Sequence, residues 1–309
     1  MNKNVALVLA SGGARGMAHI GAIEELERRG YHITSIAGTS AGALVAGLYA
    51  TGKLKEAKQW FMSLDKQKIM SLGDFSLSTS YLVKGDKIID SFKEIVDDCL
   101  IEDLPIPVSL VASDVIHNRE VVMESGSLFQ AVRASVSIPM FFRPVKKDDM
   151  LLIDGGVLNA LPLNRVRRTE GDILVAMNIS APDSIVPENK NKRNNRVQKL
   201  LENKTLLDKL DKLPAFNKLL ERFDNGQKEE NIADEVADSI NYISLVNRMT
   251  DMMIQNNTVM MTQLIHPDIL AEMPMNQFPT FAFDQTEEII ELGRQLMSTA
   301  IDNYEQQQQ

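Results

Sequence analysis

The chain has 309 residues, of which 44% are hydrophobic and 24% charged, as in a soluble globular protein that can bury one sizeable core. Its formal net charge of -9 is not that of a nucleic-acid binder, so we expect no nucleic-acid partner. One cysteine, Cys99, allows no intrachain disulfide, and no apolar run reaches the roughly 20 residues that span a bilayer, so we expect a cytoplasmic protein.

The N-terminal part alternates apolar runs, small-residue turns and helical patterns. Residues 4–10 are continuously apolar after the first position, which predicts a buried strand of a parallel sheet. A glycine-rich turn, a helix that ends at Gly30, a strand near 33–37 and a helix over 41–51 follow in turn. This β-turn-α-β-turn-α order predicts an α/β fold.

Later segments fit the same class. Strands are predicted at 107–113, 120–124, 151–153 and 173–178, and the fold should end in an amphipathic helix at 283–301. The helix over 239–264 carries five methionines, for which core packing is expected and a lining for acyl chains is the alternative.

One segment differs in composition from the rest of the chain. Residues 188–230 hold 11 Lys or Arg and 8 Asp or Glu, a local excess of positive charge in an acidic chain. We interpret residues 183–231 as a charged helical insertion within a single hydrolase domain over 1–309. A lid or a membrane-contact surface is one hypothesis for it, and a solvated flap or an oligomer contact is the other.

The pentapeptide Gly38-Thr39-Ser40-Ala41-Gly42 stands where a strand should end and a helix begin. G-x-S-x-G in that context is typical of a nucleophile elbow, a turn so sharp that only small flanking residues fit. Gly38 and Gly42 supply that room, and free N–H groups at the start of the next helix favour a developing anion. The alternative is an ordinary turn in which Ser40 or Thr39 caps the helix.

A second small-residue turn, Ser11-Gly12-Gly13-Ala14-Arg15-Gly16, follows the first predicted strand. Its glycines expose backbone N–H groups that could converge on an anion. A dinucleotide loop needs G-x-G-x-x-G with an acid about 20 residues later, and a Walker loop ends in Gly-Lys-Ser/Thr; this turn has neither pattern. An oxyanion hole for acyl transfer fits better, because parallel strands place both turns at one edge of the sheet.

A serine nucleophile needs a proton acceptor, and two residues compete for that role. Asp154 ends an apolar run and precedes Gly155-Gly156, so partial desolvation could raise its pKa toward neutrality, although a plain turn is the alternative. His266 would complete the order Ser40, Asp154, His266 of an α/β-hydrolase triad. Against that triad, only two strands precede Ser40, whereas several precede the nucleophile in that fold.

The segments 11–16, 38–42 and 154–156, in this order, resemble the signature blocks of patatin-like phospholipases. Residues 133–145, with Ile138-Pro139, are similar to an intermediate block of that family, and Ser11 stands where many members have glycine. The resemblance implies a three-layer α/β/α fold with a mostly parallel central sheet.

The resemblance also implies a Ser–Asp dyad without a histidine. Ser40 would attack the ester carbonyl, and Asp154 would take its proton and later activate water. The oxyanion hole would comprise four residues: Gly12, Gly13, Ala14 and Arg15. Arg15 could instead pin the loop through a salt bridge. Five glycines would support the site: Gly16, Gly38, Gly42, Gly155 and Gly156.

We therefore expect an enzyme that cleaves carboxylic esters of lipids, or similar apolar esters, without a metal or cofactor. A catalytically silent lipid-binding or regulatory protein on the same fold is the alternative from another class. Further expectations are transient contact with a membrane surface and, as an open choice, a homo-oligomer.

Overall fold

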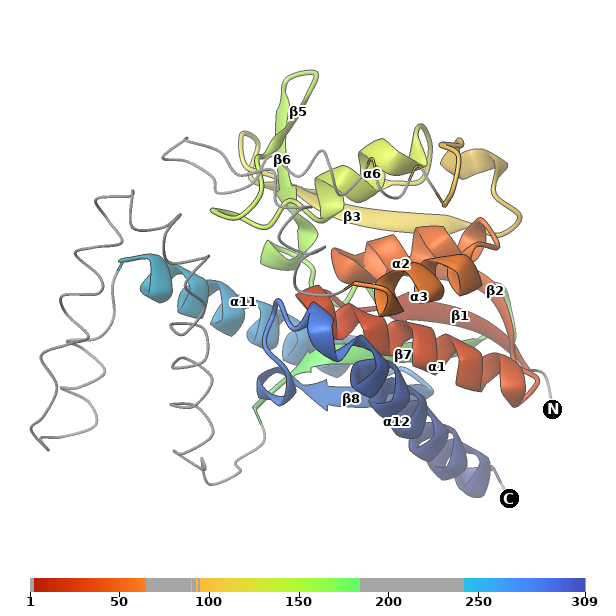
Figure 1. Ribbon diagram of the computed structural model, residues 1–309. Coiled ribbons are helices and arrows are strands. Elements are labelled where there is room, and N and C mark those ends of the chain that lie inside the picture. Colours follow the sequence, from red (N-terminus) through yellow and green to blue (C-terminus); the bar gives the residue numbers. More distant parts are fainter. Residues whose placement is uncertain (1–2, 65–89, 91–92, 94, 184–241, 309) are drawn as a thin grey trace, which may run out of the picture. The chain divides into compact units, whose positions relative to one another are not determined.

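The computed structural model describes residues 3–64, 90, 93, 95–183 and 242–308 (Figure 1). The chain divides into two compact units, Met1–Asp183 with Arg248–Gln309, and Ser184–Asn247. Of the second unit, the structure describes only residues 242–247. The predicted insertion at 183–231 therefore lies, apart from Asp183, outside the described residues. The insertion and its role stay predictions.

The strands form one eight-stranded mixed sheet in the order β5-β6-β3-β2-β1-β7-β8, with β4 paired to β3. Pairing is parallel from β3 through β2, β1 and β7 to β8, and antiparallel where β4, β5 and β6 join. The bounds are β1 (Asn4–Leu9), β2 (His32–Thr39), β3 (Val108–Asp114), β4 (Arg119–Met123), β5 (Val145–Lys147), β6 (Met150–Asp154), β7 (Ile173–Ala181) and β8 (Ile269–Pro274).

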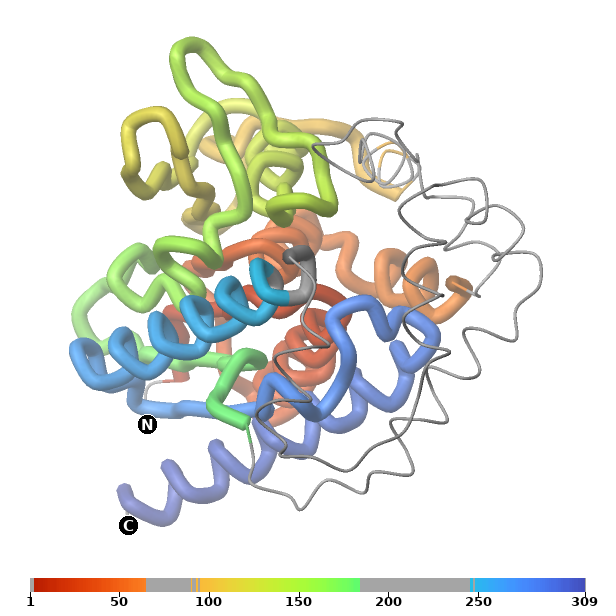
Figure 2. Tube along the Cα trace, turned by 90° about the vertical axis from the view of Figure 1, so that its left-hand side faces the viewer, coloured from red at the N-terminus to blue at the C-terminus, as the bar shows by residue number. Residues whose placement is uncertain are grey.

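Helices flank this sheet, which confirms the predicted three-layer α/β/α class. They are α1 (Met17–Arg28), α2 (Ala41–Ala50), α3 (Leu54–Met62), α6 (Leu128–Ser135), α11 (Tyr242–Leu264) and α12 (Thr286–Gln307). Short 3-10 turns are η1 (Gly13–Gly16), η2 (Ile101–Asp103), η3 (Gly155–Val157), η4 (Met275–Gln277) and η5 (Phe283–Gln285). In Figure 2, β8 runs between α11 and α12, so helices lie on both sides of the strands.

The central strands are buried as their continuous apolar runs predict. Every residue of β7 is buried, and in β1 only Asn4 is partly exposed. Strands β5 and β8 were not predicted: β5 is a three-residue segment with Lys146 and Lys147, and β8 carries Glu272 and Pro274. Strand β5 is too short and polar to show a pattern, whereas β8 does alternate, with Ile269, Ala271 and Met273 buried, a signal that could have predicted it.

Helix α1 begins directly after the first glycine turn and packs closely on α12. A Cβ on Gly21 would lie 1.9 Å from the Ile290 carbonyl oxygen, and a Cβ on Gly293 would lie 2.1 Å from that of Ala18. Only glycine permits this approach, so the backbones of α1 and α12 are in direct contact. This contact fixes the start of α1, directly after the glycine turn.

The methionine-rich helix α11 departs from its predicted role. Met249, Met252, Met253 and Met260 are 45–65% exposed, so the expectation of core packing is wrong for them. Met261 alone of the five packs against the core. No helix in the described part of the chain is long and apolar enough to cross a membrane.

Candidate active site

Ser40 occupies a strained bend between β2 and α2. Its backbone has φ 55° and ψ -120°, a conformation that costs a non-glycine residue about 1–3 kcal/mol and clusters at functional sites. A Cβ on Gly38 would lie 2.4 Å from the Gly42 carbonyl carbon, and one on Gly42 would lie 2.2 Å from the Leu9 carbonyl oxygen. Both flanking positions therefore require glycine, as the elbow pattern predicts.

The Ser40 hydroxyl meets the carboxylate of Asp154. Ser40 Oγ donates a hydrogen bond of 2.5 Å to Asp154 Oδ2, and both side chains are buried. Strand register explains the meeting, because Thr39 pairs with Val111 of β3, and Ala112 of β3 pairs with Asp154. Strand β3 thus aligns the end of β2 with the end of β6.

Burial changes the acidity of Asp154. Desolvation raises the pKa of its carboxyl group to about 6, although hydrogen bonds from Ser40 and from the Gly156 amide oppose the shift. The Gly156 N–H donates to Oδ1 at 2.8 Å, so each carboxylate oxygen has one donor. A carboxylate with this pKa is ionised at neutral pH and is basic enough to accept a proton in that range.

Ser135, at the end of α6, holds the backbone of the elbow. The Ser40 N–H donates to Ser135 Oγ at 2.8 Å, and Ser135 Oγ donates to the Val111 carbonyl at 2.6 Å. Ser135 lies in the segment 133–139 that resembles a family block, but nothing in its sequence context predicts this role. The Ser135 hydroxyl accepts the hydrogen bond of the Ser40 amide, so this amide is not available to a substrate oxygen.

The glycine turn lies directly beside the elbow. A Cβ on Gly16 would be 2.4 Å from the Ala41 Cβ, and a Cβ on Gly156 would be 2.8 Å from Ser11 Oγ. The close approach of these small residues brings together three turns that are separate in the sequence: 11–16, 38–42 and 154–156. Gly155 must also be glycine, since an added Cβ would lie 2.3 Å from the Val111 carbonyl oxygen.

The four predicted oxyanion residues differ in what they can offer. The Ala14 N–H already donates to the Thr280 carbonyl at 2.8 Å. By contrast, the amides of Gly12 and Gly13 donate to no other residue in the described part of the chain. The Ala41 amide, at the first position of α2, is likewise without an acceptor among these residues, and the sequence analysis did not name it.

The Arg15 side chain points away from this role. It is buried, and its guanidinium donates to the carbonyls of Ile179, at 3.1 Å, and Phe278, at 2.9 Å. Burial lowers the pKa of Arg15 to about 10, although the nearby Asp251 and Asp183 raise it. The side chain therefore pins the loop, through carbonyl hydrogen bonds rather than through a salt bridge.

The histidine triad has no geometric basis. His266 is exposed in the connection that leads into β8, where Asp268 N–H bonds the Leu174 carbonyl near the start of β7. That connection lies at the amino ends of the parallel strands, whereas Ser40 follows the carboxyl end of β2. His19 is buried, and its Nε2 bonds the Ala10 carbonyl at 2.9 Å rather than Ser40 or Asp154.

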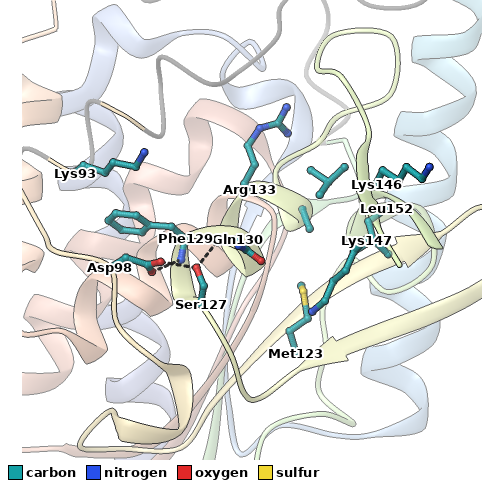
Figure 3. A pocket seen from close by; sticks show the side chains of 12 residues that line it. Lys93, Asp98, Met123, Ser127, Phe129, Gln130, Arg133, Lys146, Lys147 and Leu152 are labelled. Carbon is teal, nitrogen blue, oxygen red and sulfur yellow. Dashed lines mark hydrogen bonds between the residues drawn. The ribbon is translucent and has the colours of Figure 1, made fainter. Parts of the chain in front are cut away.

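A separate cavity of about 400 Å³ lies between α6 and the β5–β6 hairpin. Figure 3 shows Met123, Lys147 and Leu152 among its walls, with Arg133 rising from α6 on the side away from Met123. Neither Ser40 nor Asp154 lines it. No group of three or more acidic, histidine or cysteine side chains in the described residues could hold a metal ion.

Comparisons with known proteins agree with the motifs. A family model described as patatin-like phospholipase matches residues 7–166. The chain is 42% identical to an NTE family protein of Mycobacterium tuberculosis over 180 residues, which are 58% of this chain and 50% of that protein. It is 31% identical to the mouse (Mus musculus) patatin-like phospholipase domain-containing protein 6 over 186 residues, or 58% of this chain and 14% of that protein.

The matched segments cover only part of each of these relatives. The chain spans half the length of the mycobacterial relative and a smaller share of the mouse protein. Among solved structures, VipD from Legionella pneumophila aligns with 98% of this chain and 67% of its own, with a TM-score of 0.45 and 14% sequence identity.

Proposed function

Because the chain belongs to the patatin-like phospholipase family, we propose that it is a serine hydrolase that cleaves carboxylic ester bonds of lipids through a Ser40–Asp154 dyad. The family supports lipid acyl hydrolysis in general. The assignment of individual residues and of ester substrates is our proposal. The observation that carries it is the 2.5 Å hydrogen bond from Ser40 Oγ to Asp154 Oδ2, in a buried setting that raises the carboxyl pKa.

In the first half of the reaction, Ser40 Oγ attacks the ester carbonyl carbon and passes its proton to Asp154. The carbonyl oxygen becomes an oxyanion, and we propose the amides of Gly12, Gly13 and Ala41 as its donors. None of these three amides has another acceptor in the described part of the chain. Collapse of this intermediate breaks the ester bond, and the protonated Asp154 returns its proton to the departing alcohol.

In the second half, water replaces the alcohol. Asp154, ionised again, takes a proton from the water as its oxygen attacks the acyl carbon of the Ser40 ester. The second tetrahedral intermediate then releases the fatty acid, and the proton on Asp154 returns to Ser40 Oγ. One carboxylate therefore serves as base and acid in both halves, and no histidine takes part.

Ala14 and the Arg15 side chain have supporting roles in this proposal. The Ala14 amide holds Thr280, and the Arg15 guanidinium holds the carbonyls of Ile179 and Phe278. Both fix the loop that presents the Gly12 and Gly13 amides. Pre-set donors cost little reorganisation during the reaction, which is the main source of their catalytic value.

The wider expectations remain proposals. We propose apolar esters as substrates and transient contact with a lipid surface, which the exposed methionines of α11 support. A single domain over 1–309, a lid at 183–231, a cytoplasmic location and a homo-oligomer all stay predictions.

The proposed function is tested by hydrolysis of a p-nitrophenyl acyl ester and by release of fatty acids from a mixed lipid extract. Wild-type protein should release both products, and Ser40→Ala should lose at least about a thousandfold in turnover, as expected when a nucleophile is removed. A Ser40→Ala protein that keeps its turnover would contradict the dyad. Wild-type protein that binds lipid without hydrolysing it would favour the silent lipid-binding alternative.

A further inference from the structure

The proposed dyad is closed to a lipid-sized substrate. Ser40 is 2% exposed and Asp154 is 4% exposed. An ester carbonyl carbon must come within bonding distance of Ser40 Oγ, so residues around the site must move before an acyl ester can react. Side chains of two loops can make this movement and then touch the acyl chain, an inference that rests on the proposed function.

A first loop, residues 136–143, lies on the Asp154 side of the site. Its Ser137 carbonyl accepts the Asp154 N–H at 2.9 Å, so one end is fixed to the candidate base. Arg133 on α6 holds both ends, because it donates to Ser137 Oγ at 2.6 Å and to the Arg143 carbonyl at 2.9 Å. Figure 3 shows this side chain standing up from α6.

The middle of this first loop is much less restrained. Its backbone is closed by a turn in which Phe142 N–H donates to the Ile138 carbonyl at 2.9 Å. Met140, at the tip, has φ 65°, a conformation unfavourable for a residue with a side chain. A tip whose backbone is held by a local turn, with a strained residue in it, can rearrange while both ends stay fixed.

A second loop, residues 278–282, lies on the opposite side. The Thr280 carbonyl accepts the Ala14 N–H, and the Phe278 carbonyl accepts Arg15 Nη1. Phe278 and Ala282 are each 4% exposed, whereas Phe281 between them is 48% exposed. The loop backbone is therefore fixed to the proposed oxyanion turn, and the Phe281 ring projects from it.

The two loops meet through their aromatic rings. Phe141 stacks on Phe281 with ring centroids 4.4 Å apart and an interplanar angle of 28°, and Phe142 meets Phe141 edge-on at 4.8 Å. Ser40 follows β2, which lies between β3 and β1. The first loop bonds Asp154, whose strand pairs with β3, and the second loop follows β8, which lies beyond β1 and β7 in the sheet. The Phe141–Phe281 contact thus links loops from both sides of the strand that carries Ser40.

We propose that Phe141 and Phe281 form an aromatic gate that opens to admit the acyl chain and then contacts it, so that the two rings set acyl-chain preference. Unstacking separates the loops without breaking the hydrogen bonds that fix Ser137, Phe278 and Thr280. The freed rings present apolar faces, the chemistry that a saturated or unsaturated hydrocarbon chain recognises.

Two measurements test the aromatic gate. The first is the rate at which a small fluorophosphonate labels Ser40. Phe141→Ala and Phe281→Ala should each raise it about two- to tenfold, the range expected for loss of one stacked ring pair. Because both substitutions remove the same contact, the double variant should label no faster than the faster single variant. Phe281→Tyr keeps the stack and should label at the wild-type rate.

The second measurement separates chain recognition from general damage. The ratio of KM for p-nitrophenyl dodecanoate to KM for p-nitrophenyl acetate should rise severalfold in the alanine variants, because both esters gain from the open gate and only the long chain loses its contacts with the rings. The kcat for both esters should change little, because neither ring is proposed to touch the reacting atoms. Ile116→Ala, a 60% exposed side chain after β3, is the matched control and should behave as wild type.

The outcomes are distinct. Wild-type protein that takes the probe on Ser40 and hydrolyses both esters, while Phe141→Ala and Phe281→Ala match it in labelling and KM, overturns the gate alone. Strictly additive effects in the double variant also overturn it. Wild-type protein that neither labels nor hydrolyses overturns the proposed function, and the gate falls with it.

Discussion

Ser40 Oγ lies 2.5 Å from Asp154 Oδ2, although 114 positions separate the two residues in the chain. The contact depends on β3, because β2 and β6 pair with successive parts of one edge of β3, while β4 pairs with its other edge. Strand β6 runs along this edge toward the end of β2, so its last residue, Asp154, pairs with Ala112, one position beyond the Thr39–Val111 pair. The register of β6 on β3 therefore brings the carboxylate to the hydroxyl at the end of β2.

The pH dependence of kcat/KM should report Asp154. Burial raises the pKa of this carboxyl group to about 6, and the proposed base works in its ionised form. Activity should therefore be level above about pH 7 and fall roughly tenfold per pH unit well below pH 6. Added methanol should shift this midpoint upward, as for a carboxylic acid, because a less polar solvent disfavours the carboxylate. A midpoint that stays or falls in methanol would indicate a histidine base instead.

Asp154→Asn should stabilise the fold at alkaline pH while it abolishes activity. The folded-state pKa of about 6 is above the ordinary value of 3.8 for this carboxyl group, so Asp154 favours folding only while protonated. That contribution is complete below the unfolded pKa and is lost as pH rises through about 6. At pH 8 the asparagine variant should gain up to roughly 3 kcal/mol in unfolding free energy, and at pH 4 little. Urea unfolding at both pH values measures this, and a variant that is less stable at pH 8 would contradict the desolvation argument.

Ser135→Ala should weaken both the fold and the reaction. It leaves the buried Ser40 N–H without an acceptor and the Val111 carbonyl without this donor. One unpaired buried group costs about 1–3 kcal/mol, so the unfolding free energy should fall by about that amount. The strained Ser40 bend should also loosen, and kcat should fall about tenfold or more. Gln130→Ala, on the same helix, is the control, and equal behaviour of the two variants would exclude a special role for Ser135.

Variants of Arg15 test whether its side chain holds the glycine turn in place or contacts the oxyanion. Arg15→Met leaves the Ile179 and Phe278 carbonyls without their guanidinium donor, so unfolding free energy should fall by about 2–4 kcal/mol. Arg15→Lys, with a single ammonium, should recover only part of it. Both variants should lose kcat in proportion to the lost stability. A large loss of kcat at unchanged stability would instead support direct contact of the guanidinium with substrate.

The three turns of the site could be predicted from the sequence, because each turn requires small residues at fixed positions. The glycines around Ser40 and the Asp154-Gly155-Gly156 turn are of this kind, and their order along the chain resembles one family. Their close packing in space depends on β6 pairing antiparallel to β3. No local pattern in Met150–Asp154 encodes that direction.

The supporting residues could not be predicted for a similar reason. Ser135 and Thr280 act through one hydroxyl and one carbonyl, and no residue type marks a carbonyl acceptor in a sequence. Helix α6 has eight residues, too few to show a clear period. The methionines of α11 follow helical spacing, yet their exposure depends on what packs against them, which spacing does not specify.

The most direct test of the account is the site and rate of covalent labelling by a fluorophosphonate, measured by mass spectrometry of peptides from the folded protein. We predict one adduct, on the peptide that carries Ser40, formed at similar rates in wild type and His266→Gln. In Asp154→Asn the rate should fall at least about a hundredfold, since the proposed proton acceptor is gone. An adduct on another residue, or labelling of Asp154→Asn at the wild-type rate, would contradict the Ser40–Asp154 dyad.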